Sequence, residues 1–102
     1  MSRLRRPWVA GKVFFVTCNL LRTRTNMARR DFEALADAVR RVRERRRFQM
    51  AAYVFMPDHW HMIIVPGPSD SLPKIMNALK AAAARGINES RNSSGPVWQA
   101  RY

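Results

Sequence analysis

The chain has 102 residues, which suits one small domain covering residues 1–102. It carries 19 Lys and Arg against 7 Asp and Glu, a formal net charge of +12 at pH 7 that predicts a polyanionic partner, most simply nucleic acid. The single cysteine, Cys18, excludes an internal disulfide, and the sequence has neither an apolar run of about 18 residues nor a signal peptide, so we expect a cytoplasmic, non-membrane protein.

Residues 2–11 are predicted to form an irregular basic arm. Arg3, Arg5 and Arg6 lie within four positions, and Trp8 follows them. Such an arm can follow a phosphate backbone and stack a base on its tryptophan. The alternative is a solvated segment whose tryptophan packs on the domain.

Lys12–Asn19 is rich in Val, Phe and Thr, which predicts a β-strand. Its side chains alternate between two faces, with Val13, Phe15 and Thr17 on one and Phe14, Val16 and Cys18 on the other. We expect Cys18 to be a small buried residue and not a nucleophile. In the loop that follows, 20–28, Arg22 and Arg24 are candidate phosphate contacts.

The segment Arg29–Arg47 predicts a helix. Its apolar residues recur at steps of three and four, and it contains neither glycine nor proline. The end of the segment, RRVRERRR, is strongly basic, and positive charge there complements the helix dipole. This basic end either forms a solvated face that attracts DNA at long range or contacts phosphates directly.

Two apolar runs, separated by a Pro57–Asp58 corner, predict an antiparallel hairpin of strands at Phe48–Met56 and His59–Val65. Because strand side chains alternate, His59 and His61 share one face, and the residues next to His61 point the other way. Two imidazoles at this spacing can hold one divalent ion. The alternative is a pair of partly exposed histidines beside a turn, since two ligands do not make a tight site.

Asp70 or Ser71 is expected to cap a second helix that ends near Asn88. Val97–Tyr102 predicts a fourth strand. The resulting order of strand, helix, strand, strand, helix, strand predicts an α+β fold, the ferredoxin-like β-α-β-β-α-β sandwich, with a four-stranded antiparallel sheet and two helices on one face.

The stretch MPDHWHMIIV resembles the HUH motif of single-tyrosine transposases, and within them the REP-associated tyrosine transposases. The resemblance extends over nearly the whole chain, through RLRRPWVAGKVFFVTCN followed by Arg22, the helix with Lys80 and Asn88, and GPVWQARY. It implies that His59 and His61 bind Mg²⁺ or Mn²⁺, which polarises the scissile phosphate of single-stranded or hairpin DNA before a tyrosine hydroxyl attacks. The candidate DNA-binding residues are Arg3, Arg5, Arg6, Arg22, Arg24 and Lys80.

In that family the nucleophilic tyrosine lies on a helix beyond the Trp-Gln strand, together with a third metal ligand. We therefore expect the chain to be a truncated form that lacks this helix and cleaves DNA poorly. Tyr102 is a candidate nucleophile, although a terminal residue is poorly held for in-line attack. Tyr53 is expected in the core or on the sheet surface. Gln99 and Asp58 are candidates for the third metal ligand.

A second hypothesis is a non-catalytic module that binds single-stranded nucleic acid. RNA-recognition motifs have the same element order and stack bases on aromatic residues of the first and third strands. Phe14 or Phe15 would serve on the first strand and Trp60 on the third. A third hypothesis is a poorly folded remnant whose uncovered apolar sheet favours a homodimer or aggregation.

Overall fold

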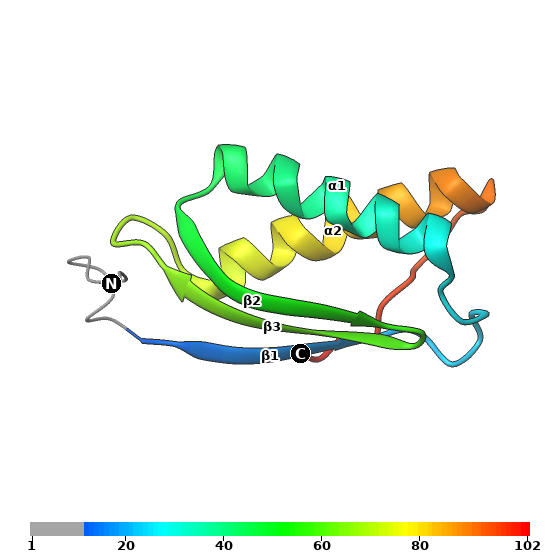
Figure 1. Ribbon diagram of the computed structural model, residues 1–102, viewed down its shortest axis with the longest axis horizontal. Coiled ribbons are helices and arrows are strands. Elements are labelled where there is room, and N and C mark those ends of the chain that lie inside the picture. Colours follow the sequence, from blue (N-terminus) through cyan, green and yellow to red (C-terminus); the bar gives the residue numbers. More distant parts are fainter. Residues whose placement is uncertain (1–11) are drawn as a thin grey trace.

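A computed structural model describes residues 12–102, arranged as three strands and two helices in one layered domain (Figure 1). The basic arm, with Arg3, Arg5 and Arg6, lies outside the described residues. The elements follow the order β1 (Phe14–Asn19), α1 (Arg29–Arg45), β2 (Phe48–Met56), β3 (His59–Pro66) and α2 (Leu72–Arg91).

The sheet has the strand order β1-β3-β2, and both pairings are antiparallel. Both helices cover the same face of the sheet (Figure 1). The short Pro57–Asp58 corner makes β2 and β3 a hairpin, as predicted, and the first strand pairs with the other side of β3. Strand β3 is therefore central, which places its residues between two neighbours.

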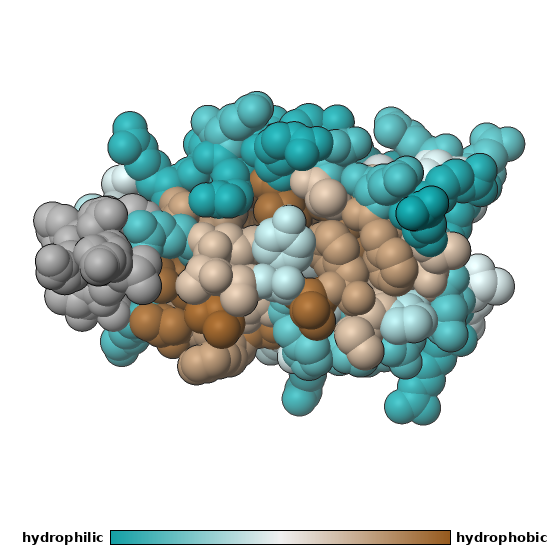
Figure 2. Space-filling view, in the orientation of Figure 1, coloured by the Kyte–Doolittle hydropathy of each residue, from teal (hydrophilic) through white to brown (hydrophobic). Residues whose placement is uncertain are grey.

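Strand alternation divides the sheet into a helix-covered face and an open face. The covered face carries a continuous buried core, which includes Val16, Cys18, Trp60, Met62 and Ile64 from the strands. The open face carries the intervening residues, among them several exposed apolar side chains. Figure 2 shows hydrophobic surface over the strands and hydrophilic surface over α1, consistent with the basic outer face of that helix.

The predicted fourth strand is wrong. Val97–Tyr102 makes only an isolated antiparallel bridge, between Trp98 and Leu20, and the sheet of the described residues has three strands. The ammonium group of Lys80 donates hydrogen bonds to the carbonyls of Gln99 and Ala100, at 2.9 and 3.2 Å. This bonding draws the segment toward α2, so the ladder with β1 does not continue beyond the bridge.

The two helices approach closely where Gly86 of α2 lies against Ala34 of α1. A Cβ added at Gly86 would meet the Ala34 Cβ and carbonyl oxygen at 3.4 Å, which is close van der Waals contact. The helix bounds differ slightly from those predicted, since α1 ends two residues earlier and α2 continues three residues further, to Arg91. Among residues 12–102, no helix combines the length and apolarity that crossing a membrane requires.

The extra turn of α2 is stabilised by an ion pair between Arg91 and the buried Asp31 of α1. The guanidinium donates to both carboxylate oxygens, at 3.1 and 2.9 Å, and also to the carbonyls of Thr25 and Asn26. Desolvation alone raises the pKa of the Asp31 carboxyl. Hydrogen bonds from Arg91 and the Ala28 amide, the charge of Arg91 and a hydrogen bond from Ser90 outweigh it and hold the pKa below its ordinary value.

Candidate functional site

The two histidines lie at the start of β3 on the open face of the sheet, as strand alternation predicts. His59 is half-buried and His61 is exposed, whereas Trp60 between them is fully buried on the helix-covered face. In the antiparallel register His59 pairs with Asn19 and His61 with Thr17 of β1. On the other side they pair with residues of β2, so both imidazoles are supported by neighbouring strands.

The two imidazole rings converge through the same ring nitrogen. The Nε2 atoms of His59 and His61 lie 3.1 Å apart, and the ring centroids are 4.7 Å apart with an interplanar angle of 77°. The rings therefore meet edge to face and do not stack. The two Nε2 atoms are thus the closest polar contact between the rings on the open face.

The Nδ1 atom of each imidazole forms a hydrogen bond with a different polar group. The Asp58 carboxylate lies 2.7 Å from Nδ1 of His59, and the Thr17 hydroxyl lies 2.9 Å from Nδ1 of His61. Partners of this kind fix ring orientation and tautomer in histidines that ligate metals. Asp58 thus lies on the Nδ1 side of His59, and its role as a third metal ligand stays a prediction.

The spacing of the Nε2 atoms fits two ligands of one ion. Nitrogens at about 2.1 Å from a metal lie about 3.0 Å apart at a right angle and about 3.4 Å apart at a tetrahedral angle. The observed 3.1 Å falls between these limits. Among residues 12–102, no three His, Cys, Asp or Glu side chains gather into a metal-binding group.

A polar groove adjoins the His59 end of the sheet. It has a volume of about 350 Å³ and is lined by Asn19, Leu20, Leu21, Arg22, Arg24, Asn26, Asp58 and Gln99. The loop that forms one wall is docked on the hairpin corner, since the Leu20 amide donates to the Asp58 carbonyl at 2.9 Å. Gln99 is oriented by donating to the Leu20 carbonyl at 3.1 Å, which places the other candidate third ligand in this groove.

The two arginines predicted in this loop have different environments. Arg22 is exposed and makes no side-chain hydrogen bond within residues 12–102, so it is available to a phosphate. Arg24 is half-buried, and its guanidinium donates to Pro96, Asn88, Ser93, Ser94 and Gly95. All five N–H donors of Arg24 are thereby used to hold the loop after α2. This bonding does not favour a phosphate contact by Arg24, which stays a prediction.

Lys80 and Tyr102 lie away from the histidines. Lys80 binds the carbonyls of the C-terminal segment, and its ammonium lies 5.7 Å from the centre of the Tyr102 ring. Tyr102 borders a groove with Phe14 and Pro66, at the opposite end of β1 and β3 from the histidines. At about 3.3 Å per strand residue, this separates it from the site by well over 10 Å. This position does not favour Tyr102 as the nucleophile, and that role stays a prediction.

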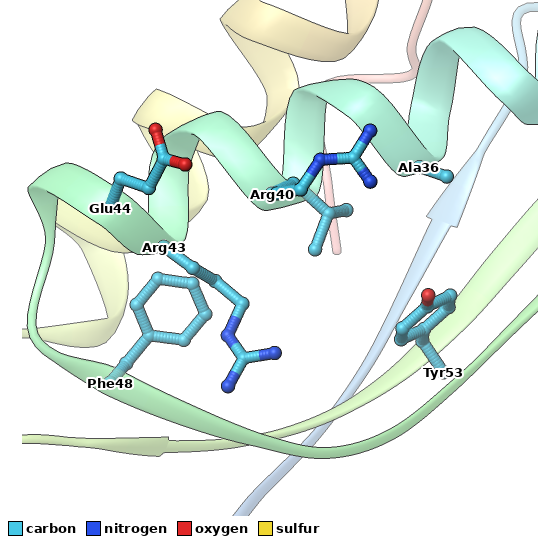
Figure 3. A pocket seen from close by; sticks show the side chains of 7 residues that line it. Ala36, Arg40, Arg43, Glu44, Phe48 and Tyr53 are labelled. Carbon is cyan, nitrogen blue, oxygen red and sulfur yellow. The ribbon is translucent and has the colours of Figure 1, made fainter.

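Tyr53 lies on the helix-covered side of β2. Its side chain points toward α1, where it lines a groove with Arg40, Arg43 and Phe48 (Figure 3). Tyr53 pairs with Met62, whose side chain belongs to the buried core, so its ring is on the face opposite the histidines. Neither tyrosine of the described residues has its hydroxyl beside the Nε2 pair.

The open face beside the histidines is apolar. Phe15, the second residue of β1, is 80% exposed, and Val54 and Met56 of β2 are exposed beside β3. The aromatic residue needed on the third strand of an RNA-recognition motif is absent, because Trp60 is buried beneath the helices. That version of the second hypothesis is therefore wrong.

Sequence reasoning found the histidine pair but not Thr17 as a partner of His61. Alternation alone placed Thr17 on the correct face, yet the register of β1 against β3 decides which residue it meets. Cys18, next to it, is fully buried as predicted, and burial raises the pKa of its thiol to about 11, which excludes a ready thiolate nucleophile.

Comparison with known proteins places this chain among transposases. A family model described as Transposase IS200 like matches residues 12–102. The REP-associated tyrosine transposase of Escherichia coli (strain K12) is 33% identical over 103 residues, which cover 100% of this chain and 59% of that protein. The chain thus spans about three fifths of the length of this curated relative.

Two solved structures are also similar to this chain. The structure of a REP-associated tyrosine transposase bound to a REP hairpin matches with a TM-score of 0.71 and 25% identity, over 99% of this chain and 59% of that one. A protein of Deinococcus radiodurans R1 with a provisional transposase assignment matches with a TM-score of 0.74 and 19% identity, over 97% of this chain and 81% of that one. The second likeness shows the fold alone.

Proposed function

This chain belongs to the IS200-like transposase family, and from that premise we propose that residues 12–102 form the ion-binding and strand-binding part of a transposase that acts on single-stranded or hairpin DNA. The observation that carries the proposal is the 3.1 Å approach of the His59 and His61 Nε2 atoms. A relative described as bound to a REP hairpin supports hairpin DNA as the partner.

We propose that His59 and His61 hold a divalent ion, Mn²⁺ or Mg²⁺. Such an ion would neutralise charge on the scissile phosphate and polarise it for attack. Imidazole nitrogen suits transition metals better than Mg²⁺, so Mn²⁺ is expected to bind more tightly. The remaining positions would be filled by oxygens, including those of the phosphate.

The DNA strand is proposed to run over the open face and into the polar groove at its His59 end. Arg22 would contact a phosphate there, and the amide side chains of the groove would bind phosphate or base edges. Phe15 offers an exposed ring on the same face on which a base can stack. The net charge of +12 adds a long-range attraction for the strand.

We propose that residues 12–102 bind and position the strand but do not cleave it by themselves. Transesterification by a tyrosine needs the hydroxyl in line with the phosphate that the ion holds. Tyr53 points toward α1 and Tyr102 lies at the other end of the strands, so neither meets this condition.

The proposal is tested by measuring the affinity of the protein for a DNA hairpin with a single-stranded flank, with and without Mn²⁺. We expect tighter binding with Mn²⁺ and no such gain for the double variant His59→Ala/His61→Ala. Asn77→Ala, an exposed change on α2, is the matched control and should behave as wild type. An unchanged Mn²⁺ response in the double variant would contradict the ion site.

The same mixture on a denaturing gel tests the second part of the proposal. We expect no covalent protein–DNA adduct. An adduct that disappears with Tyr102→Phe would show that Tyr102 is a nucleophile after all.

The alternative function is a non-catalytic module that binds single strands without an ion. The exposure of Phe15 favours it, since a stacking residue needs no metal. This alternative would be supported if affinity for single-stranded DNA did not depend on Mn²⁺ but was lost in the variant Phe15→Leu.

A further inference from the structure

The two histidines are supported by groups of different chemical capacity. His59 faces a carboxylate, which accepts hydrogen bonds and has no hydrogen to donate when ionised. His61 faces a hydroxyl, which can either donate or accept because its hydrogen rotates about the C–O bond. This difference decides how each ring can carry its proton.

The carboxylate permits one arrangement of His59. Asp58 is largely exposed, and its oxygen lies 2.7 Å from Nδ1. Nδ1 must therefore carry the hydrogen that is donated to Asp58. In the neutral ring, Nε2 then has only its lone pair, directed at the Nε2 atom of His61.

The contact between the rings sets the arrangement of His61 in the ion-free protein. At 3.1 Å the two Nε2 atoms are within hydrogen-bond distance, so one of them must carry a hydrogen. His59 has none there, so the hydrogen belongs to Nε2 of His61. Nδ1 of His61 then has a lone pair and accepts from the Thr17 hydroxyl at 2.9 Å.

An ion at the proposed site requires the opposite tautomer of His61. Both Nε2 atoms must then present lone pairs, so the hydrogen of His61 must be on Nδ1. The number of protons on the ring does not change. Thr17 can accommodate the change by turning its hydroxyl from donor to acceptor, which a carboxylate or a methyl group in its place could not do.

We propose that Thr17 is a positioning residue that allows His61 to switch tautomer when the ion binds, while Asp58 keeps His59 in one tautomer. This inference rests on the proposed ion site. Outer partners of metal-bound histidines typically change metal affinity by about 10- to 100-fold when removed. The structure gives the pair a fixed ligand and an adaptable one.

Imidazole nitrogen NMR tests the inference directly, with Zn²⁺ as a diamagnetic probe at a pH where both rings are neutral. Without Zn²⁺ we expect hydrogen on Nδ1 of His59 and on Nε2 of His61. With Zn²⁺ the His59 hydrogen should stay on Nδ1, and the His61 hydrogen should move to Nδ1. A His61 tautomer that is the same in both states would overturn the proposal.

Three variants separate this role from simple packing. Thr17→Val keeps the shape but removes the hydroxyl, and we expect Zn²⁺ and Mn²⁺ affinity to fall by about 10-fold or more. Thr17→Ser should restore it, and Thr23→Val, a loop control with an exposed side chain, should leave it unchanged. Circular dichroism checks that each variant is folded.

The outcomes distinguish the inference from the function on which it rests. If wild type binds no ion, the proposed function and the switch both fail. If wild type binds the ion and folded Thr17→Val binds it equally well, only the role of Thr17 is overturned.

Discussion

Strand β3 has one sequence but two surfaces with opposite properties. On the helix-covered face, Trp60, Met62 and Ile64 are almost completely buried. On the open face, the ring of His59 is held by Asp58 of the hairpin corner and the ring of His61 by Thr17 of β1. The exposed Phe15 lies on the same face. Along this single strand, residues that stabilise the fold alternate with residues of the proposed ion site. Substitutions on one face should therefore change the free energy of unfolding, and substitutions on the other should change ion binding.

The largest effect on stability is expected from Trp60→Ala. Removing a fully buried tryptophan leaves a cavity under both helices and should reduce the free energy of unfolding by about 3–5 kcal/mol. His61→Ala, one residue along on the open face, should change it by less than about 1 kcal/mol while abolishing the Mn²⁺ response. Urea unfolding followed by circular dichroism measures both, and similar losses for the two variants would contradict the separation.

The second effect lies on the helix side, at the Asp31–Arg91 ion pair. Asp31→Asn should destabilise the protein by roughly 2–3 kcal/mol at neutral pH, because charged hydrogen bonds to Arg91 are lost. Since folding lowers the pKa of Asp31, its stabilising contribution is complete above the unfolded-state pKa of about 3.9 and is lost as pH falls through the lower folded-state value.

The pH dependence of unfolding provides the check. Below about pH 4, the free energy of unfolding should fall less steeply for Asp31→Asn than for wild type. Mn²⁺ binding at neutral pH should be nearly unchanged in this variant as long as it is folded. An identical acid decline in both proteins would show that the ion pair contributes little.

A smaller effect is expected from Phe15→Leu on the open face. The change should leave stability within about 0.5 kcal/mol but weaken binding of single-stranded DNA by about 10-fold, through loss of base stacking. Tyr53→Leu removes an aromatic ring on the other face and is the matched control. Equal loss of DNA affinity in both variants would contradict a strand path over the open face.

The smallest effect is expected from Arg22→Ala in the polar groove. Removing one phosphate contact should lower the slope of log affinity against log salt by about 0.7 for a single strand. Arg24→Ala should instead lower stability, because its guanidinium holds the loop after α2. Salt titrations of DNA binding and urea unfolding of both variants measure these effects. A lower salt slope for Arg24→Ala and lower stability for Arg22→Ala would contradict the prediction.

Local patterns in the sequence were sufficient to predict β1, β2 and β3, both helices and the face on which the histidines lie. Alternation within β3 fixes where His59 and His61 point, because the period of a strand does not depend on distant contacts. Apolar spacing predicted both helices to within a few residues at their ends. These features depend on residues that are near one another in the chain.

The partners of charged residues could not be predicted, because they are distant in sequence. Arg24 donates hydrogen bonds to the loop 93–96, and Lys80 donates hydrogen bonds to the carbonyls of Gln99 and Ala100. Composition marks such residues as basic but does not show which donors are already used within the fold. The fourth strand failed for the same reason, since Lys80 competes for the carbonyls of that segment.

The most direct measurement of the central claim is a crystal soaked in Mn²⁺ and examined by anomalous scattering. We expect an anomalous peak on the open face within bonding distance of Nε2 of both His59 and His61. Asp58 and Thr17 should still be hydrogen-bonded to the Nδ1 atoms. A peak bound instead by the Asp58 carboxylate, or no peak at the histidines at saturating Mn²⁺, would contradict it.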